Sequence, residues 1–117
     1  MRYKRSERVS ALILQEVAGM IEEGLKNPNI GFVTVTAVEV SDDLRHAKIY
    51  VVPHGDDAER ARTLKALDDS LPWIRRELAR TLDLKYVPTL AFRADRSFDH
   101  ADRINRLLDE IHEEEKD

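Results

Sequence analysis

The side chains with the clearest chemistry in this 117-residue chain are arginines. Arg75 and Arg76 are adjacent, and Arg80 follows four residues after Arg76, on the same face of a helix. A guanidinium group is planar and carries several N–H donors, so it can hold two phosphate oxygens at once. This spacing favours contact with a nucleic-acid backbone, although a solvated helix surface can show the same pattern.

The net charge of −4 argues against a nucleic-acid partner only until its distribution is considered. Residues 109–117 hold six acids and one lysine, whereas residues 1–108 hold 18 basic and 17 acidic side chains. The segments 1–8 and 72–96 each carry an excess of three positive charges. A partner responds to charge within about one Debye length, roughly 8–10 Å, so local clusters matter more than the total. We therefore predict two basic contact regions.

Patterns that would indicate an enzyme are missing from the sequence. It has no glycine-rich phosphate loop, no nucleophile elbow and no cysteine, and its four histidines lack the spacing of zinc ligands. His54 with Asp56 and Asp57 is the remaining candidate for a metal site or a small hydrolase, but a polar loop and a helix cap explain these residues more simply. We predict no catalytic residues, no metal and no cofactor.

Apolar residues at helical spacing predict the elements that must position the basic side chains. A first helix is predicted over residues 6–25, and a second begins at Asp56 or Asp57 and breaks near Ser70-Leu71-Pro72. Pro72 suits the first turn of the helix that follows. The stripe predicted to face the core in the first helix consists of Val9, Leu12, Ile13, Val17, Met20, Ile21 and Leu25. The apolar positions of the broken helix are Ala61, Leu64, Leu67 and Leu71 before the break and Trp73, Ile74, Leu78 and Leu82 after it.

Three strands are predicted between these helices. Residues 32–40 are rich in β-branched side chains, and residues 46–52 place Ala47, Ile49 and Val51 on one face. The short turn between them predicts an antiparallel hairpin. Residues 87–94 alternate in the same way, with Arg93 on the face opposite Leu90 and Phe92, and a last helix is predicted from Ser97.

This order of elements predicts an α+β two-layer domain with its helices on one face of the sheet. The domain should span residues 1–111, followed by an acidic tail at 112–117. No apolar run approaches the roughly 20 residues of a membrane span, so we expect a cytoplasmic protein that contacts no membrane. Trp73, beside the break, could belong to the core or could stack on a base.

Several motifs occur in an order that resembles a known family. They are Arg5-Ser6-Glu7-Arg8-Val9, Val33-Thr34-Val35-Thr36-Ala37-Val38-Glu39-Val40-Ser41-Asp42-Asp43-Leu44 leading to Ala47, Trp73-Ile74-Arg75-Arg76-Glu77-Leu78, Val87-Pro88-Thr89-Leu90-Ala91-Phe92 and Asp95-Arg96-Ser97. Together they cover the chain from about residue 2 to residue 111. On these motifs the chain resembles the ribosome-binding factor A family of bacterial small-subunit maturation factors.

The resemblance implies a type II KH-like fold, α-β-β-α-kink-α-β, with an additional C-terminal helix. In that family a helix–kink–helix replaces the usual Gly-x-x-Gly loop, and this chain contains no Gly-x-x-Gly. The family's kink is usually Ala-x-Gly, whereas the matching positions here are Ser70-Leu71-Pro72. Proline still enforces the break, but it removes the backbone donor and the close approach that glycine permits.

The resemblance also implies a function. It predicts binding to the free small (30S) ribosomal subunit, to its 16S rRNA and neighbouring ribosomal proteins, in support of late maturation and processing of the rRNA 5′ end. It implies no catalytic activity, and we expect a monomer. The alternative is a protein-interaction module that uses the basic helix surface and the acidic tail without RNA.

Eight residues are predicted to contact RNA. The match to the family supplies Arg5, Arg8, Ser70 and Arg75. Charge and position on the predicted elements add Arg76, Arg80, Lys85 and Arg93.

Overall fold

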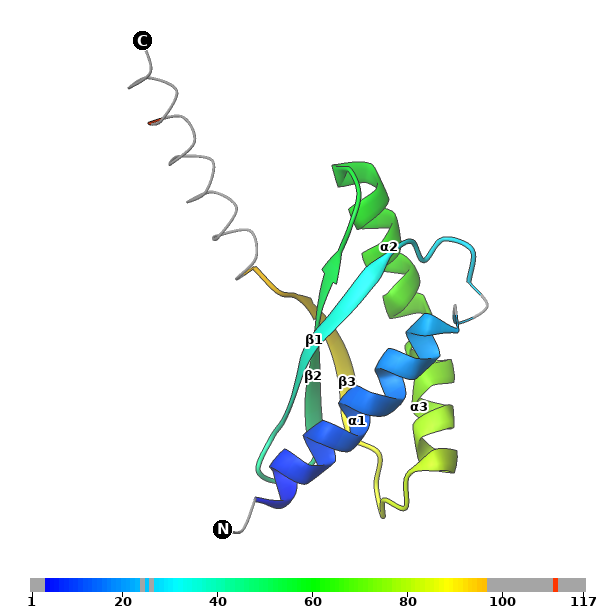
Figure 1. Ribbon diagram of the computed structural model, residues 1–117. Helices are drawn as coiled ribbons and strands as arrows, with labels where there is room; N and C mark the ends of the chain where they lie inside the picture. Colours follow the sequence, from blue (N-terminus) through cyan, green and yellow to red (C-terminus); the bar gives the residue numbers. More distant parts are fainter. Residues whose placement is uncertain (1–3, 24, 26, 97–110, 112–117) are drawn as a thin grey trace.

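A computed structural model describes residues 4–23, 25, 27–96 and 111 of the chain (Figure 1). Its elements are α1 (Arg5–Glu22), β1 (Val33–Val40), β2 (His46–Pro53), α2 (Asp57–Asp69), α3 (Leu71–Thr81) and β3 (Thr89–Ala94). This order confirms the α+β class and is compatible with the type II KH-like fold that the resemblance implies. The helix predicted from Ser97 and the acidic tail lie outside the described residues, apart from Ile111, which is helical.

The three strands form one sheet with β2 in the centre. β1 and β2 pair antiparallel, which confirms the predicted hairpin, and β3 pairs parallel to β2. Parallel neighbours need a long crossover, which α2 and α3 provide here. Residues of β2 alternate between buried and exposed or half-buried, with Ala47, Ile49 and Val51 buried as predicted.

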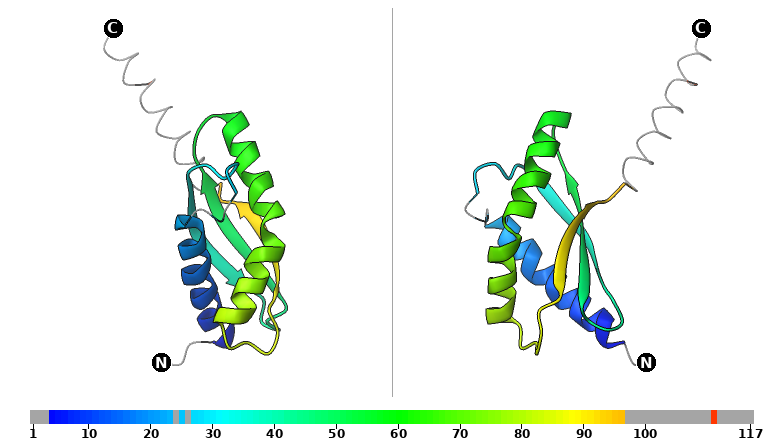
Figure 2. Two further views of the ribbon diagram at one scale, coloured as in Figure 1. Left: turned by 90° about the vertical axis from the view of Figure 1, so that its right-hand side faces the viewer. Right: turned by 180° about the vertical axis from the view of Figure 1, so that it is seen from behind.

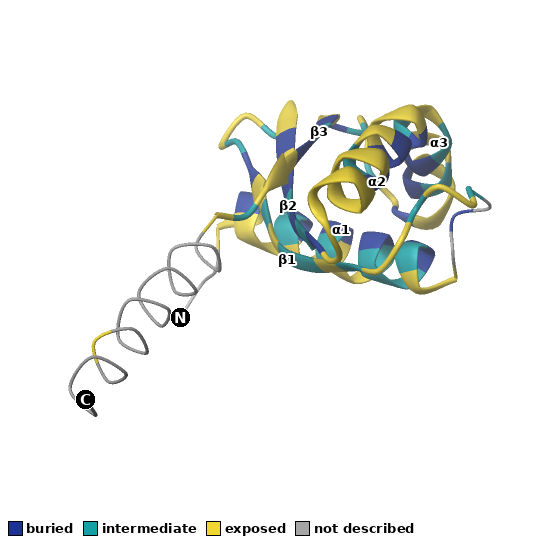
Figure 3. Ribbon diagram, turned by 90° about the horizontal axis from the view of Figure 1, so that it is seen from above, coloured by how far each residue is buried: buried dark blue, intermediate teal, exposed yellow. Residues whose placement is uncertain are grey.

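Helices α1, α2 and α3 cover the same face of the sheet, and the core lies between the two layers (Figures 2 and 3). The buried side chains of the core include Val9, Ile13 and Val17 from α1, Val40, Ala47, Ile49, Val51, Leu90 and Phe92 from the sheet, and Leu67, Ile74 and Leu78 from α2 and α3. Each apolar stripe thereby leaves water, and this burial is the main favourable term in folding. The other face of the sheet carries polar side chains such as Lys48 and Arg93.

The buried stripe of α1 is narrower than predicted. Leu12, expected in the core, is 45% exposed. The reason is geometric, because successive helical residues lie about 100° apart and Leu12 therefore points away from the line of Val9, Ile13 and Val17. Leu25 is buried as expected, but it lies beyond the end of the helix at Glu22, with a positive φ of 46°.

The break between α2 and α3 occurs where the sequence predicts it. Asp56 caps α2, because its side chain accepts a hydrogen bond from the backbone N–H of Glu59 while Glu59 reaches back to Asp56. Ser70 separates the two helices, and Pro72 lies in the first turn of α3. Ala61 proves to be exposed, and Thr63 takes the buried position on α2 instead.

Candidate nucleic-acid interface

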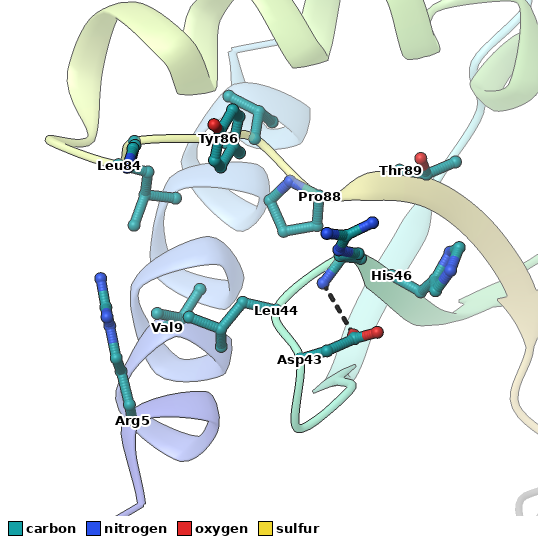
Figure 4. A pocket seen from close by; sticks show the side chains of 12 residues that line it. Arg5, Val9, Asp43, Leu44, His46, Leu84, Tyr86, Pro88 and Thr89 are labelled. Atoms are coloured by element: carbon teal, nitrogen blue, oxygen red, sulfur yellow. Dashed lines mark hydrogen bonds between the residues drawn. The ribbon is translucent and has the colours of Figure 1, made fainter.

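Three segments that are distant in the sequence meet at the end of the molecule that is lowest in Figure 1. They are the start of α1, the turn between β1 and β2, and the loop between α3 and β3. Between them lies a groove of about 770 Å³, here called the large groove. It is lined by Arg5, Val9, Asp43, Leu44, Arg45, His46, Leu84, Lys85, Tyr86, Val87, Pro88 and Thr89 (Figure 4). Its volume is within the range of roughly 300–1,000 Å³ that is typical of ligand clefts.

The turn between β1 and β2 has a conformation that positions the basic residue following it. The backbone N–H of Leu44 donates to the carbonyl oxygen of Ser41 at 2.8 Å, and Leu44 has a φ of 62°. This conformation costs a leucine about 1–2 kcal/mol, which packing of its side chain against the core offsets. Arg45 follows directly, and its carbonyl oxygen accepts a hydrogen bond from the N–H of Thr89 at 2.8 Å. The turn is thereby attached to the start of β3.

Asp43 is the acidic residue of the large groove, and its hydrogen bonds keep it within the turn. The Ser41 hydroxyl donates to its carboxylate at 2.6 Å, and the backbone N–H of Arg45 donates at 3.0 Å. These two hydrogen bonds are the main reasons that the pKa of Asp43 lies below its ordinary value of 3.8. The carboxylate therefore stays ionised at neutral pH and stabilises the turn that carries Arg45.

A second groove, here called the small groove, lies beside the first. It has a volume of about 490 Å³ and is lined by Pro72, Arg75, Arg76, Ala79, Lys85, Tyr86 and Val87. The four residues from α3 recur at helical spacing and therefore share one face. The guanidinium of Arg75 donates to the carbonyl oxygen of Val87 at 3.2 Å, which ties α3 to the loop before β3.

The two grooves share Lys85, Tyr86 and Val87, so the loop between α3 and β3 forms the ridge between them. The cations along both grooves are exposed. Within the described part of the chain, the one ion pair joins Arg80 to Glu77 at 2.7 Å, so none of the groove cations forms a salt bridge there. Asp43 is the one acidic side chain among the residues that line the two grooves, against five basic ones. These groove cations are Arg5, Arg45, Arg75, Arg76 and Lys85. A surface of this kind suits a polyanion.

The structure brings together four of the eight residues predicted to contact RNA: Arg5, Arg75, Arg76 and Lys85. Arg8 and Arg80 are exposed but line neither groove. Arg93 is exposed and pairs with Tyr50 across the sheet, on the face opposite the helices. These three residues could contact RNA only outside the grooves.

Ser70 is placed differently from what the sequence predicts. It is buried, and its hydroxyl donates to the carbonyl oxygen of Ala66 at 2.8 Å, one turn earlier in α2. This placement gives no support to a contact between the Ser70 side chain and RNA. Trp73, beside it, is partly buried and packs against the core, which favours the core role among the two alternatives.

Sequence reasoning missed three residues of the large groove: Arg45, His46 and Tyr86. Arg45 and His46 form a basic pair directly after the turn, and Tyr86 follows Lys85, so each stood beside a feature that the sequence already marked. Their convergence depends on the parallel pairing of β3 with β2, which places residues 46 and 89 side by side. Local periodicity does not predict that pairing.

His54, Asp56 and Asp57, the alternative candidate for a metal site, do not form a group of metal ligands. Among the described residues, no three His, Cys, Asp or Glu side chains form such a group. The Nε2 atom of His54 instead lies 2.9 Å from the Thr34 hydroxyl, and its ring lies 5.4 Å from that of Phe32. Separately, no helix within the described residues is long and apolar enough to cross a membrane.

Comparison with known proteins gives consistent matches along the chain. A sequence model of the family described as ribosome-binding factor A matches residues 5–108. Ribosome-binding factor A of Geobacter metallireducens is 46% identical over 113 residues, which cover 97% of this chain and 96% of that protein.

Two structures of relatives have the same fold. The solution NMR structure of a Thermotoga maritima protein described as a putative ribosome binding factor A has a TM-score of 0.70 at 28% identity, covering 83% of this chain and 93% of that one. A homology model of Thermus thermophilus ribosome binding factor A, fitted into the cryo-EM map of a 30S–RbfA complex, has a TM-score of 0.59 at 27% identity. That match covers 74% of this chain and 91% of the other.

Proposed function

Because the chain belongs to the ribosome-binding factor A family, we propose that it binds the free 30S ribosomal subunit through 16S rRNA and supports late maturation of that subunit. The Thermus thermophilus relative fitted into the map of a 30S–RbfA complex supports this partner. We propose that this chain supports processing of the rRNA 5′ end. It would do so as a monomeric cytoplasmic binding factor rather than as an enzyme.

The observation that carries this proposal is the gathering of cations at one end of the molecule. Arg5, Arg45, Arg75, Arg76 and Lys85 come from four separate parts of the chain and line two adjoining grooves. Contacts from arginine and lysine to phosphate oxygens hold a protein in register on RNA. Neighbouring ribosomal proteins would then meet the surfaces beside the grooves.

The proposal is tested by reversing charge at the small groove. The double variant Arg75→Glu, Arg76→Glu exchanges two attractive contacts for two repulsive ones, so we expect at least a tenfold weaker association with purified small subunits. Co-sedimentation through sucrose gradients at several salt concentrations measures it. Wild-type binding should fall steeply as salt rises, and the protein should migrate with free small subunits rather than with complete ribosomes.

The control makes the same change of charge elsewhere. Arg62 and Lys65 are exposed on α2, outside both grooves, so Arg62→Glu, Lys65→Glu should bind nearly as the wild type does. If both double variants lost the same affinity for small subunits, binding would depend on the net charge of the protein and not on the grooves. Binding that survives digestion of the rRNA with ribonuclease would favour a protein partner instead.

A further inference from the structure

Tyr86 is a large aromatic side chain in a place where folding does not require one. It is 76% exposed, although it lies between buried Pro88 and half-buried Leu84 and Val87. It lines the large groove (Figure 4) and also the small groove, so it lies on the ridge between them. A single exposed aromatic ring is ordinary on a protein surface, so exposure alone assigns Tyr86 no role. What distinguishes Tyr86 is its place between two grooves that are lined by cations.

The surroundings of Tyr86 combine a flat apolar surface with positive charge. The ammonium group of Lys85 lies 5.7 Å from the centre of the Tyr86 ring, within the range of a cation–π contact. Arg5 and Arg45 line the groove on one side of the ridge, and Arg75 and Arg76 line the groove on the other. An aromatic ring beside a path of cations is how proteins hold single-stranded nucleic acid, with bases on the ring and phosphates on the cations.

Paired RNA would not use this arrangement. In an A-form duplex the faces of the bases are stacked on each other, and a protein reaches only phosphates, ribose hydroxyls and base edges. A ring can receive a base only where the base is unpaired and turned outward. The exposed face of Tyr86 therefore distinguishes an unpaired strand from a duplex, whereas the arginines would hold either.

We propose that Tyr86 stacks on an unpaired base of RNA, with the strand crossing the ridge from one groove to the other. The inference deepens the proposed function and rests on it, since it names single-stranded nucleotides as what this surface binds. The phosphates on one side of the stacked base then meet Arg5 and Arg45. Those on the other side meet Arg75 and Arg76.

Phe32 provides a matched control. It is 79% exposed and lies just before β1, whose first residue pairs with the end of β2, whereas Tyr86 lies just before β3, whose first residue pairs with the start of β2. The two rings therefore lie at opposite ends of the sheet. Phe32 is flanked by the His54 ring at 5.4 Å and lines neither groove. Phe32→Ala therefore removes as much exposed aromatic surface as Tyr86→Ala does, without touching the ridge.

The experiment measures binding of the full chain to two probes at low salt. One is a fluorescein-labelled oligoadenylate of about ten nucleotides, and the other is the same ribose-phosphate chain with abasic positions. We expect Tyr86→Ala to weaken oligoadenylate binding roughly 5- to 150-fold, the range for loss of one stacked base, and to leave abasic binding unchanged. Tyr86→Phe, which keeps the ring, and Phe32→Ala should bind oligoadenylate as the wild type does.

The proposal is overturned if Tyr86→Ala binds oligoadenylate as well as the wild type does, or if it loses equal affinity for both probes. The same variants are then measured on purified small subunits. If Arg75→Glu, Arg76→Glu loses binding there while Tyr86→Ala does not, subunit binding stands and the stacking contact is refuted. If Tyr86→Ala loses subunit binding but not oligoadenylate binding, the ring meets a ribosomal protein, and the proposal is likewise refuted.

Discussion

At the scale of single residues, Ser10 shows how a helix side chain completes the edge of the sheet. β1 is an edge strand, so half of its backbone groups lack a strand partner. The N–H of buried Val40, at the end of β1, donates to the Ser10 hydroxyl at 3.1 Å, and that hydroxyl donates to the carbonyl oxygen of Ser6 at 2.7 Å. One side chain thus satisfies a buried donor and attaches α1 to the sheet.

We therefore expect Ser10→Ala to lower the free energy of unfolding by about 1 kcal/mol. The variant leaves the Val40 N–H buried without its partner, and the better helix propensity of alanine offsets part of that loss. Urea denaturation followed by circular dichroism measures the change. Thr81→Val is the control, because its exposed hydroxyl bonds only within α3, to the carbonyl oxygen of Glu77. That variant should stay within about 0.5 kcal/mol of the wild type, and an equal loss in both variants would contradict the role of Ser10.

At the scale of elements, local sequence predicts the helices and strands well because their signals are local. Alternation in β2 and the proline that breaks the second helix depend on residues a few positions apart, and both predictions are confirmed. Leu12 was misjudged because periodicity gives the direction of a stripe but not its width. The width depends on how closely α1 approaches β1 and α3, which is set by the tertiary packing.

The break between α2 and α3 yields a prediction about Ser70. Because its hydroxyl is buried and bonded to Ala66, Ser70→Ala should reduce the affinity for small subunits less than twofold. The free energy of unfolding should fall by no more than about 1 kcal/mol, the net value of one such hydrogen bond. Co-sedimentation and urea denaturation measure the two quantities. A tenfold loss of binding with little loss of stability would instead show that Ser70 contacts the RNA, as the sequence predicts.

At the scale of the whole molecule, the fold decides which basic residues act together. The sequence indicates positive charge in segments 1–8 and 72–96, and its alternation places Arg93 on the strand face opposite Leu90 and Phe92, but it does not show which cations meet at one end of the molecule. Arg45 is absent from both segments, yet the turn between β1 and β2 brings it to the large groove. Arg93 belongs to the second segment, and β3 holds it on the face opposite the helices, as its alternation with Leu90 and Phe92 predicts. The place of Arg45, His46 and Tyr86 in the candidate site therefore depended on long-range pairing, which spacing along the chain does not encode.

This division predicts different salt dependences for two arginine variants. Each phosphate contact contributes roughly 0.7–0.9 to the slope of log affinity against log salt concentration, because binding releases condensed counterions. With all five groove cations on phosphates, the slope for small-subunit binding should be about −4. Arg45→Ala removes one such contact and should make the slope less steep by nearly one unit. Equilibrium binding measured at four or more salt concentrations gives the slope.

Arg93→Ala is the matched comparison, since it removes the same charge from an exposed arginine on the other face of the sheet. Its slope should equal that of the wild type, because one RNA surface cannot reach the grooves and the open sheet face together. A decrease as large as that of Arg45→Ala would mean that RNA wraps around the sheet edge. The grooves would then be only part of the contact surface, and the cations of both faces would have to be counted together.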